Sequence, residues 1–296
     1  MELIHLRYFK KAAELESITK AANELRISQP SLTKMIKTLE NELQYELFDR
    51  KGRNIILNDN GKIFLKHVNL IFDAMHNAVL ELNDHNQKKQ MTITISVMAA
   101  GKLLPDLIQG FKKKHPNINI DIITLDTDSV AESSCDLLLS SSLESEDCPG
   151  STTLFKENLM LAVPKGHALA SQPFVQLKTL KNEDFVASKP NSVYRKILMH
   201  YFDQAGFTPK IVLDSDYSSI IKSLVQSGIG IAIMPEYTWE EAADSHLAFL
   251  PIVDPPCFRY LKLYWNPYKY ATQAVEKFKS YTIDFFKSLD LSEPSP

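Results

Sequence analysis

SITKAANELRISQPSLTKMIKTLENE, residues 17–42, is the stretch that decides the fold. Its first part predicts a short helix over Thr19–Leu25, which is followed by a turn at residues 25–27. Ser28 is a good N-cap for a second helix, and Pro30 lies in that helix's first turn, where no N–H is missed. Apolar side chains recur along the second helix at i, i+3, i+4 and i+7, so one face is buried: Leu32, Met35, Ile36 and Leu39.

The opposite face of the second helix is polar. A helix that exposes hydroxyl, amide and ammonium groups behind a short packed helix has the form of a reading helix for the major groove of DNA. Spacing alone fits a helical hairpin with a solvated polar face equally well. The polar face carries Gln29, Ser31, Thr33, Lys34 and Lys37.

The flanking segments favour the DNA-reading interpretation. Leu3–Glu16 has an apolar stripe and is expected to pack across the helical pair. Residues 47–57 predict a strand, a turn at 51–53 and a returning strand, which together form a wing. Arg50 and Arg53, at its base and tip, are placed to meet phosphates or the minor groove. The alternative for each arginine is an ordinary surface charge.

One long helix is predicted from Asp59 to about His85. Its apolar residues are spaced 4, 3, 4, 3 and 4, which is a heptad seam typical of pairing with a second copy. A single DNA-reading head gains specificity from such pairing, because two heads read two half-sites. The polar residues 84–90 end the pattern and are the expected hinge. The seam consists of Phe64, Val68, Ile71, Met75, Ala78 and Leu82.

From Met91 onward the pattern changes to strands that alternate with helices. Predicted strands include Thr92–Val97, Ile118–Leu125 and Leu159–Val163, and predicted helices include Leu103–Lys114 and Ser192–Ala205. This alternation predicts open α/β sheets, which bind ligands at the carboxyl ends of their strands.

Composition agrees with a multidomain α+β protein. The 296 residues are too many for one typical domain. Residues 1–66 carry 12 basic and 9 acidic side chains, while the rest carry 21 and 27, so a mildly basic head precedes an acidic body. Three cysteines are an odd count with no metal-ligand spacing, which favours a reducing compartment. No apolar run approaches the roughly 20 residues of a membrane span, and a cytoplasmic location is expected.

The first sixty residues resemble the winged helix-turn-helix of the LysR-type transcriptional regulators. The matching stretches are LRYF, AANELRISQPSLTKMIKTLENEL, LFDRKGR and the Asn60-Gly61 step. Family members commonly have a Ser-Arg pair where this chain has Thr33 and Lys34. Lysine lacks the bidentate fork that arginine offers to guanine, so a relaxed base preference is expected there.

The resemblance continues through LFKENLMLAVPKGHALA and AGFTPKIVLDSDYSSIIKSLVQSGIGIAIMP. It implies a winged helix-turn-helix DNA-binding domain (1–58), a dimerisation linker helix and hinge (59–88) and an α/β effector-binding domain (89–296). The last has the fold of periplasmic binding proteins, with subdomain I at 91–163 plus 266–296 and subdomain II at 164–265.

By the same resemblance, effector contacts are expected in a cleft between the subdomains. Met98 stands where a hydroxyl is common in members that bind carboxylated aromatics. Ser192 is expected at a helix N-terminus, whose free N–H groups favour an anion, so a small anionic metabolite is the expected effector. Each hydroxyl is equally well read as a cap or loop group. The carried-over positions are Met98, Ala99, Ala100, Gly101, Thr127, Ser188, Ser192 and Tyr194.

No catalytic, metal or cofactor site is expected. The eight histidines are scattered, and no Gly-x-Ser-x-Gly, phosphate-loop or zinc-ligand pattern occurs. Two alternatives to an effector-controlled DNA-binding regulator stay open. One is a thiol-based redox regulator that uses Cys135 and Cys148, and the other is a metabolite-binding module that acts through protein partners.

The expected protein is therefore a sequence-specific regulator with a small-molecule effector. Its expected partners are double-stranded DNA with an interrupted palindromic operator, further copies of itself as a dimer or a dimer of dimers, and RNA polymerase if it activates. The sequence does not name the effector, the target genes or the sign of regulation.

Overall fold

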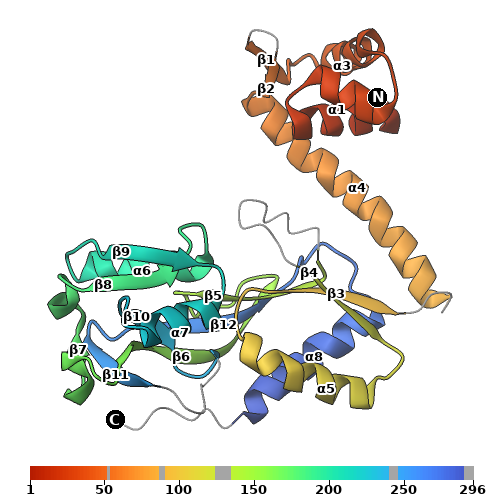
Figure 1. Ribbon diagram of the computed structural model, residues 1–296. Coiled ribbons are helices and arrows are strands. Elements are labelled where there is room, and N and C mark those ends of the chain that lie inside the picture. The colour runs from red at the N-terminus through yellow and green to blue at the C-terminus, as the bar shows by residue number, and fades with distance from the viewer. Residues whose placement is uncertain (52–53, 87–90, 124–134, 240–245, 290–296) are drawn as a thin grey trace. The chain divides into compact units, whose positions relative to one another are not determined.

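The computed structural model describes residues 1–296 except 52–53, 87–90, 124–134, 240–245 and 290–296 (Figure 1). The chain divides into two compact units, which are described separately. Unit 1 comprises residues 1–86 with Tyr268–Tyr270, and unit 2 comprises 87–267 and 271–296. No helix among the described residues is long and apolar enough to cross a membrane.

Unit 1 is a winged helix-turn-helix head that continues into a long helix. The predicted helices and wing are confirmed, and the head is closed by one apolar core that includes Leu6, Phe9, Leu32 and Leu39. The elements are α1 (Leu3–Leu15), α2 (Ile18–Leu25), α3 (Gln29–Leu43), β1 (Phe48–Lys51), β2 (Asn54–Leu57) and α4 (Asp59–His85).

Side-chain caps set the helix starts in unit 1. Ser17 accepts a hydrogen bond from the Lys20 N–H at 3.3 Å and Ser28 accepts one from the Ser31 N–H at 3.3 Å. The Asn58 side chain accepts one from the Gly61 N–H at 2.9 Å. The predicted cap at Ser28 is therefore confirmed, and Asn58 caps α4 in the same way; each satisfies an N–H that the helix itself leaves unpaired.

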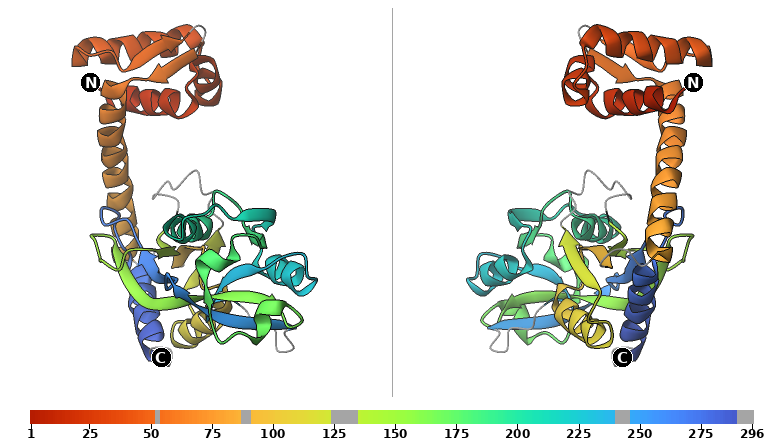
Figure 2. Two further views of the ribbon diagram at one scale, coloured as in Figure 1. Left: turned by 90° about the vertical axis from the view of Figure 1, so that its left-hand side faces the viewer. Right: turned by 90° about the vertical axis from the view of Figure 1, so that its right-hand side faces the viewer.

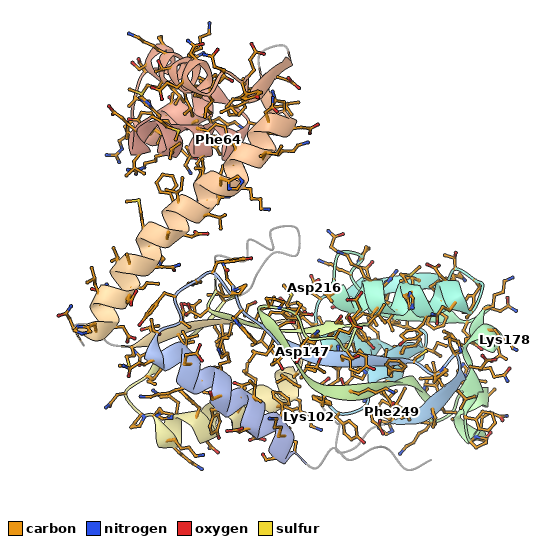
Figure 3. All side chains as sticks on the ribbon, turned by 180° about the vertical axis from the view of Figure 1, so that it is seen from behind. Phe64, Lys102, Asp147, Lys178, Asp216 and Phe249 are labelled. Atoms are coloured by element: carbon orange, nitrogen blue, oxygen red, sulfur yellow. The ribbon has the colours of Figure 1, made fainter. Side chains whose placement is uncertain are left out.

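The start of α4 is part of the head core. Val68 is fully buried there, and the Phe64 ring meets the Phe9 ring edge-on with centroids 5.2 Å apart (Phe64 is labelled in Figure 3). The predicted seam therefore divides. Its first two members pack within their own chain, because the helix must cover the head, whereas Ile71, Met75 and Leu82 remain exposed.

Unit 2 has the α/β architecture that the strand–helix alternation predicts. Helices α5 and α8 lie side by side against the sheet (Figures 1 and 2), and the rings of Phe111 and Phe278 meet edge-on at 4.8 Å. The elements are β3 (Thr92–Val97), α5 (Leu104–Lys114), β4 (Asn119–Ile123), β5 (Leu137–Ser142), β6 (Ser151–Pro164), β7 (Val175–Gln176), β8 (Asp184–Ser188), α6 (Val193–Gln204), β9 (Lys210–Ser215), α7 (Ser218–Gln226), β10 (Ala232–Pro235), β11 (Leu247–Asp254), β12 (Phe258–Tyr264) and α8 (Gln273–Ser288).

Strands β6 and β12 connect the two halves of unit 2. The main sheet has the order β4-β3-β5-β12-β6-β11-β7, with β10 also paired to β6, while β8 and β9 form a separate parallel pair. The first part of β6 pairs with β12, and its last part pairs with β10 and β11. Strand β6 is thus 14 residues long, whereas the sequence predicted only 159–163 as strand.

The apolar cores fix where each half begins. Leu261 and Leu263 of β12 pack with the core of β3, β5, α5 and α8, while Cys257 packs with the core of the second half. The sequence placed the return to subdomain I at residue 266. Tyr260–Tyr264 of β12, just before that position, pair with β5.

Candidate functional site

One face of α3 carries polar and cationic groups that no other element covers. The residues that line its shallow groove recur every three or four positions and so lie on a single side of the helix. Five of them were predicted and two, Thr38 and Asn41, were not. The groove is lined by Gln29, Pro30, Thr33, Lys34, Lys37, Thr38 and Asn41.

Several hydroxyls on α3 already have partners. Thr33 donates to the Gln29 carbonyl at 3.0 Å, and Thr38 donates to the Lys34 carbonyl at 3.0 Å. Ser31 does not line the groove, and its hydroxyl lies 2.8 Å from that of the cap residue Ser28. The threonine methyl groups thus remain for apolar contact, which is how proteins recognise the thymine methyl group.

The cations on this face are available to an anionic partner. Lys34 and Lys37 are exposed and form no ion pair among the described residues. The Gln29 amide oxygen accepts a hydrogen bond from Thr19 of α2 at 3.4 Å, so its NH₂ group remains to donate. Arg53 lies outside the described residues, and the side chain of Arg50 is likewise not described.

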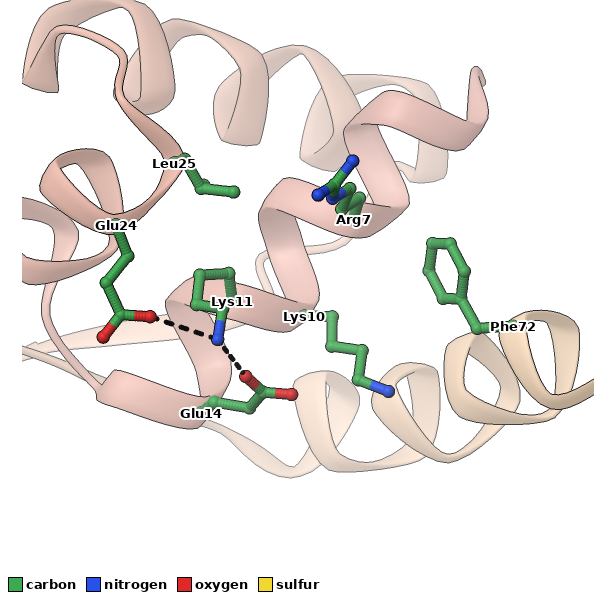
Figure 4. A pocket seen from close by; sticks show the side chains of 7 residues that line it. All are labelled: Arg7, Lys10, Lys11, Glu14, Glu24, Leu25 and Phe72. Atoms are coloured by element: carbon green, nitrogen blue, oxygen red, sulfur yellow. Dashed lines mark ion pairs between the residues drawn. The ribbon is translucent and has the colours of Figure 1, made fainter. Parts of the chain in front are cut away.

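A second hollow in the head lies among α1, α2 and α4 and has a volume of about 520 Å³ (Figure 4). Lys11 bridges Glu14 at 2.9 Å and Glu24 at 3.2 Å, and hydrogen bonding to Glu14 raises the pKa of this lysine. Lys10 lies 5.8 Å from the centroid of the Phe72 ring. These contacts connect α1 to α2 and to α4, so the hollow lies where these three helices pack together.

In unit 2 the expected effector positions differ in their surroundings. Met98 lines a cavity, whereas Ala99 and Ala100 are buried in the core of β3, β5, α5 and α8. Gly101 begins a short 3₁₀ turn, and Thr127 lies outside the described residues.

The polar positions near α6 already have partners. Ser192 caps α6 by accepting from the Arg195 N–H at 3.0 Å, and it donates to Ser188 at 3.0 Å. Tyr194 is 8% exposed and donates to the Ile233 carbonyl at 2.9 Å. Burial and this bond give the Tyr194 hydroxyl a structural role, while its contact with an effector stays a prediction.

The cavity that Met98 lines has a volume of about 380 Å³ and lies where β5 and β12 meet the start of α6. It is in the range of small-molecule sites. Leu138 and Ser140 point into it from one face of β5, since alternate residues of a strand share a face. Its walls are formed by Met98, Cys135, Asp136, Leu138, Ser140, Ser141, Cys148, Pro149, Gly150, Val193, Tyr264, Trp265, Asn266 and Pro267.

A buried charged network lies behind Ser141. The Arg259 guanidinium, 1% exposed, pairs with the fully buried Glu157 at 2.9 Å. It also donates to Ser141 at 3.0 Å and to Thr238 at 2.6 Å. Glu157 in turn accepts from the N–H groups of Tyr237 and Thr238. The network thus binds β5, β6, β12 and the segment after β10 together.

The sequence analysis predicted neither the cavity walls on β5 and β12 nor the charged network. The sequence does contain a pattern that indicates the network. Glu157 shares its strand face with Leu159 and Leu161, and Arg259 shares its face with Leu261, so each charge falls on a buried face. Opposite charges at such positions indicate a pair.

Comparison with known proteins identifies the class. The family model described as "LysR substrate binding domain" matches residues 85–287, and "Bacterial regulatory helix-turn-helix protein, lysR family" matches residues 3–62. The chain belongs to the LysR family of transcriptional regulators. It is a DNA-binding regulator with an effector-binding domain through which small molecules modulate it.

Relatives match over nearly the whole length. The HTH-type transcriptional regulator YwbI of Bacillus subtilis (strain 168) is 32% identical over 96% of this chain and 98% of its own. The transcriptional dual regulator GltC of the same organism is 31% identical over 98% of this chain and 99% of its own. Full-length BenM has a similar structure, with a TM-score of 0.57 at 25% identity over 100% of both chains. CbnR, solved in complex with its target DNA, shares the fold at a TM-score of 0.57 and 19% identity, over 95% of this chain and 99% of its own.

The thiols differ in how accessible they are. Cys135 and Cys257 are buried and Cys148 is exposed. Burial raises the pKa of the Cys257 thiol to about 12, so it stays protonated and unreactive at neutral pH.

We expect a maleimide to modify Cys148 first in the native protein and to reach Cys257 only after unfolding. Peptide mass spectrometry of a labelling time course measures the order, and Cys148→Ser is the control. Rapid labelling of Cys257 would contradict the burial seen here. If oxidant changed DNA binding and the double change Cys135→Ser with Cys148→Ser removed that response, the thiol-based alternative would replace control by an effector.

Proposed function

We propose that this regulator reads an interrupted palindromic operator as a dimer, with one α3 in the major groove of each half-site. The observation that carries the proposal is the uncovered α3 face, where Gln29, Lys34 and Lys37 have free donors. Amide and ammonium donors match the acceptors on base edges and phosphates. Arg50 and Arg53 are proposed to hold phosphates or the minor groove from the wing, and Pro30 and Ser31 to contact the sugar or bases nearby.

A footprint on the DNA upstream of its own gene, across a salt series, tests this proposal. Two protected half-sites about one helical turn apart, or a multiple of it, that survive moderate salt are expected for sequence-specific binding by a dimer. Diffuse protection that disappears with salt would indicate phosphate attraction alone and would count against the proposal.

Replacing Gln29 by alanine is expected to weaken operator binding by about 1–3 kcal/mol and to relax the base preference at one base step. The reason is that the amide donates to a base edge. Binding to operators that are permuted at each position measures the effect. Lys66→Glu, on the exposed side of α4, is the control for effects of a substitution that do not involve α3. An equal loss on every sequence would show that Gln29 contacts only phosphate.

We further propose that the exposed part of α4 pairs with α4 of a second copy. Ile71, Met75 and Leu82 are 39%, 48% and 63% exposed, and Ala78 continues the same stripe. A contiguous apolar stripe at heptad spacing on a monomer marks a helix pairing surface.

Met75→Glu combined with Leu82→Glu is expected to convert the dimer to monomers, because each places a charge in an apolar seam. Sedimentation velocity measures the change, and Lys66→Glu, away from the stripe, should leave the dimer intact. A dimer that survives the double change would show that other surfaces hold the copies together.

Larger assemblies of this regulator would be built from the same dimer. We propose that two dimers associate on longer operators and that an activating complex contacts RNA polymerase. The site of action is the cytoplasm, because the target is DNA. No enzymatic step is proposed.

A further inference from the structure

We infer that the effector held in the 380 Å³ cavity is an uncharged molecule with a largely apolar body. This inference rests on the regulator's control by small molecules and takes this cavity as the place where they bind. The residues that form the walls of the cavity indicate the chemical class of the ligand.

The walls are apolar over most of their surface. Met98, Leu138 and Val193 come from three different elements, and the rings of Tyr264 and Trp265 follow from the end of β12. Burial raises the pKa of the Tyr264 hydroxyl, as a poorly hydrated wall requires. Apolar walls of this kind bind a ligand by removing its apolar surface from water.

The described lining of the cavity carries no cationic side chain for a bound anion. It contains no lysine, arginine or histidine, and its one carboxyl group belongs to Asp136, which accepts from the Thr94 N–H at 2.8 Å. A carboxylate there would lose hydration with no cationic side chain among these described residues to compensate.

Three basic groups on β12 and α6, two elements that border the cavity, have partners and do not line it. Arg259 is neutralised by Glu157, and the Lys262 ammonium donates to the Glu146 carbonyl at 2.6 Å. Arg195 donates to the Ser188 carbonyl at 2.8 Å. Ser192 caps α6 by accepting from the Arg195 N–H, so one of the helix N-terminal N–H groups on which the expectation of an anion rested is already paired.

Ser140 offers the ligand a polar group inside the cavity. Its residue is 4% exposed and lines the cavity. A hydroxyl both donates and accepts hydrogen bonds, so it can pair with a neutral amide or hydroxyl group. The expected molecule therefore carries a neutral polar group on an apolar ring or chain.

Matched probes of one shape and different charge test the inference on the full-length protein. Benzamide and cyclohexanecarboxamide are compared with benzoate, cyclohexanecarboxylate and benzylamine by calorimetry and by the thermal transition. We expect each amide to bind at least about tenfold more tightly than its carboxylate and than the amine, a difference of about 1.4 kcal/mol. Ser140→Ala should weaken the binding of both amides.

Two variants tie binding to this cavity. Leu138→Trp should fill it and abolish binding of the amides, whereas Phe249→Trp, on the exposed face of β11, should change nothing (Phe249 is labelled in Figure 3). Met98→Lys adds an ammonium at the half-buried rim and should reverse the preference toward benzoate. The Met98 variant keeps the test valid if the Leu138 variant fails to fold.

Equal or tighter binding of the carboxylates or of benzylamine by the wild type would overturn the inference. So would the absence of any effect of the amides. A sequence-specific footprint obtained without any ligand would stand in either case, so failure of the ligand class is distinguishable from failure of the proposed DNA-binding function.

Discussion

Replacing Glu157 by glutamine is expected to lower the free energy of unfolding of the effector domain by about 3–5 kcal/mol. Glutamine keeps the volume of the side chain but leaves the Arg259 guanidinium, which is 1% exposed, without its counter-charge. An unpaired buried charge cannot recover the hydration that it lost on folding. Urea unfolding followed by circular dichroism measures the loss in the effector-domain transition.

Two controls separate the loss of the pair from the loss of a single carboxylate. Asp216→Asn breaks the Lys189–Asp216 pair, whose side chains are 54% and 55% exposed, and should cost less than about 1 kcal/mol (Asp216 is labelled in Figure 3). Replacing both members of the buried pair, Glu157→Leu with Arg259→Met, should cost less than Glu157→Gln alone. If Glu157→Gln costs no more than Asp216→Asn, the buried pair does not stabilise this domain.

Replacing Gly61 by alanine is expected to destabilise the head by at least about 2–3 kcal/mol and to abolish operator binding. Helix propensity alone predicts the opposite sign, since alanine in a helix gains about 1 kcal/mol over glycine. In the structure a Cβ at Gly61 would meet the carbonyl oxygen of Leu47, which is backbone and cannot swing aside. The same carbonyl accepts the Asn58 N–H at 3.1 Å, so any shift also weakens the start of α4.

Gly166→Ala is the matched control, because a Cβ there has no neighbour within 4 Å. The head and effector-domain transitions should be followed separately. Only Gly61→Ala should lower the head transition, and neither change should move that of the effector domain. A more stable head in Gly61→Ala would show that propensity outweighs the close approach.

The local architecture could be predicted from the sequence wherever one periodicity decided the structure. The helices of the head, the caps at Ser28 and Asn58 and most of α4 follow from apolar spacing and N-cap chemistry. These features depend on neighbours within a few residues, so no long-range information was required.

Features that depend on tertiary pairing were harder to predict. Strand β11 contains Pro251, which counts against a strand, yet it sits at the last paired position opposite Met160 and so removes little from the ladder. The spacing of α4 likewise cannot show that Val68 faces its own head while Met75 stays exposed. Which neighbour covers a stripe is a property of the fold.

The candidate site shows the same division. The polar face of α3 was predicted because its residues lie on a single helix. The cavity brings β3, β5, β12 and α6 together, and only Met98 among the predicted positions lines it. Tyr194 was carried over as an effector position, and the sequence alone could not show that its OH donates to the carbonyl of Ile233, 39 residues away.

Strands β6 and β12, which connect the two halves of the effector domain, pair with each other from Ser151 and Tyr264 to Asn158 and Phe258. The halves are therefore joined by a hydrogen-bonded ribbon, and any change in the angle between them must bend or twist that ribbon. A paired ribbon resists such deformation elastically, whereas a pair of loose connections would swing freely. The ladder shifts register between Leu261 and Lys262, and such irregularities are where strands bend most easily. A change in the angle between the halves should accordingly be a graded flexing centred near that shift.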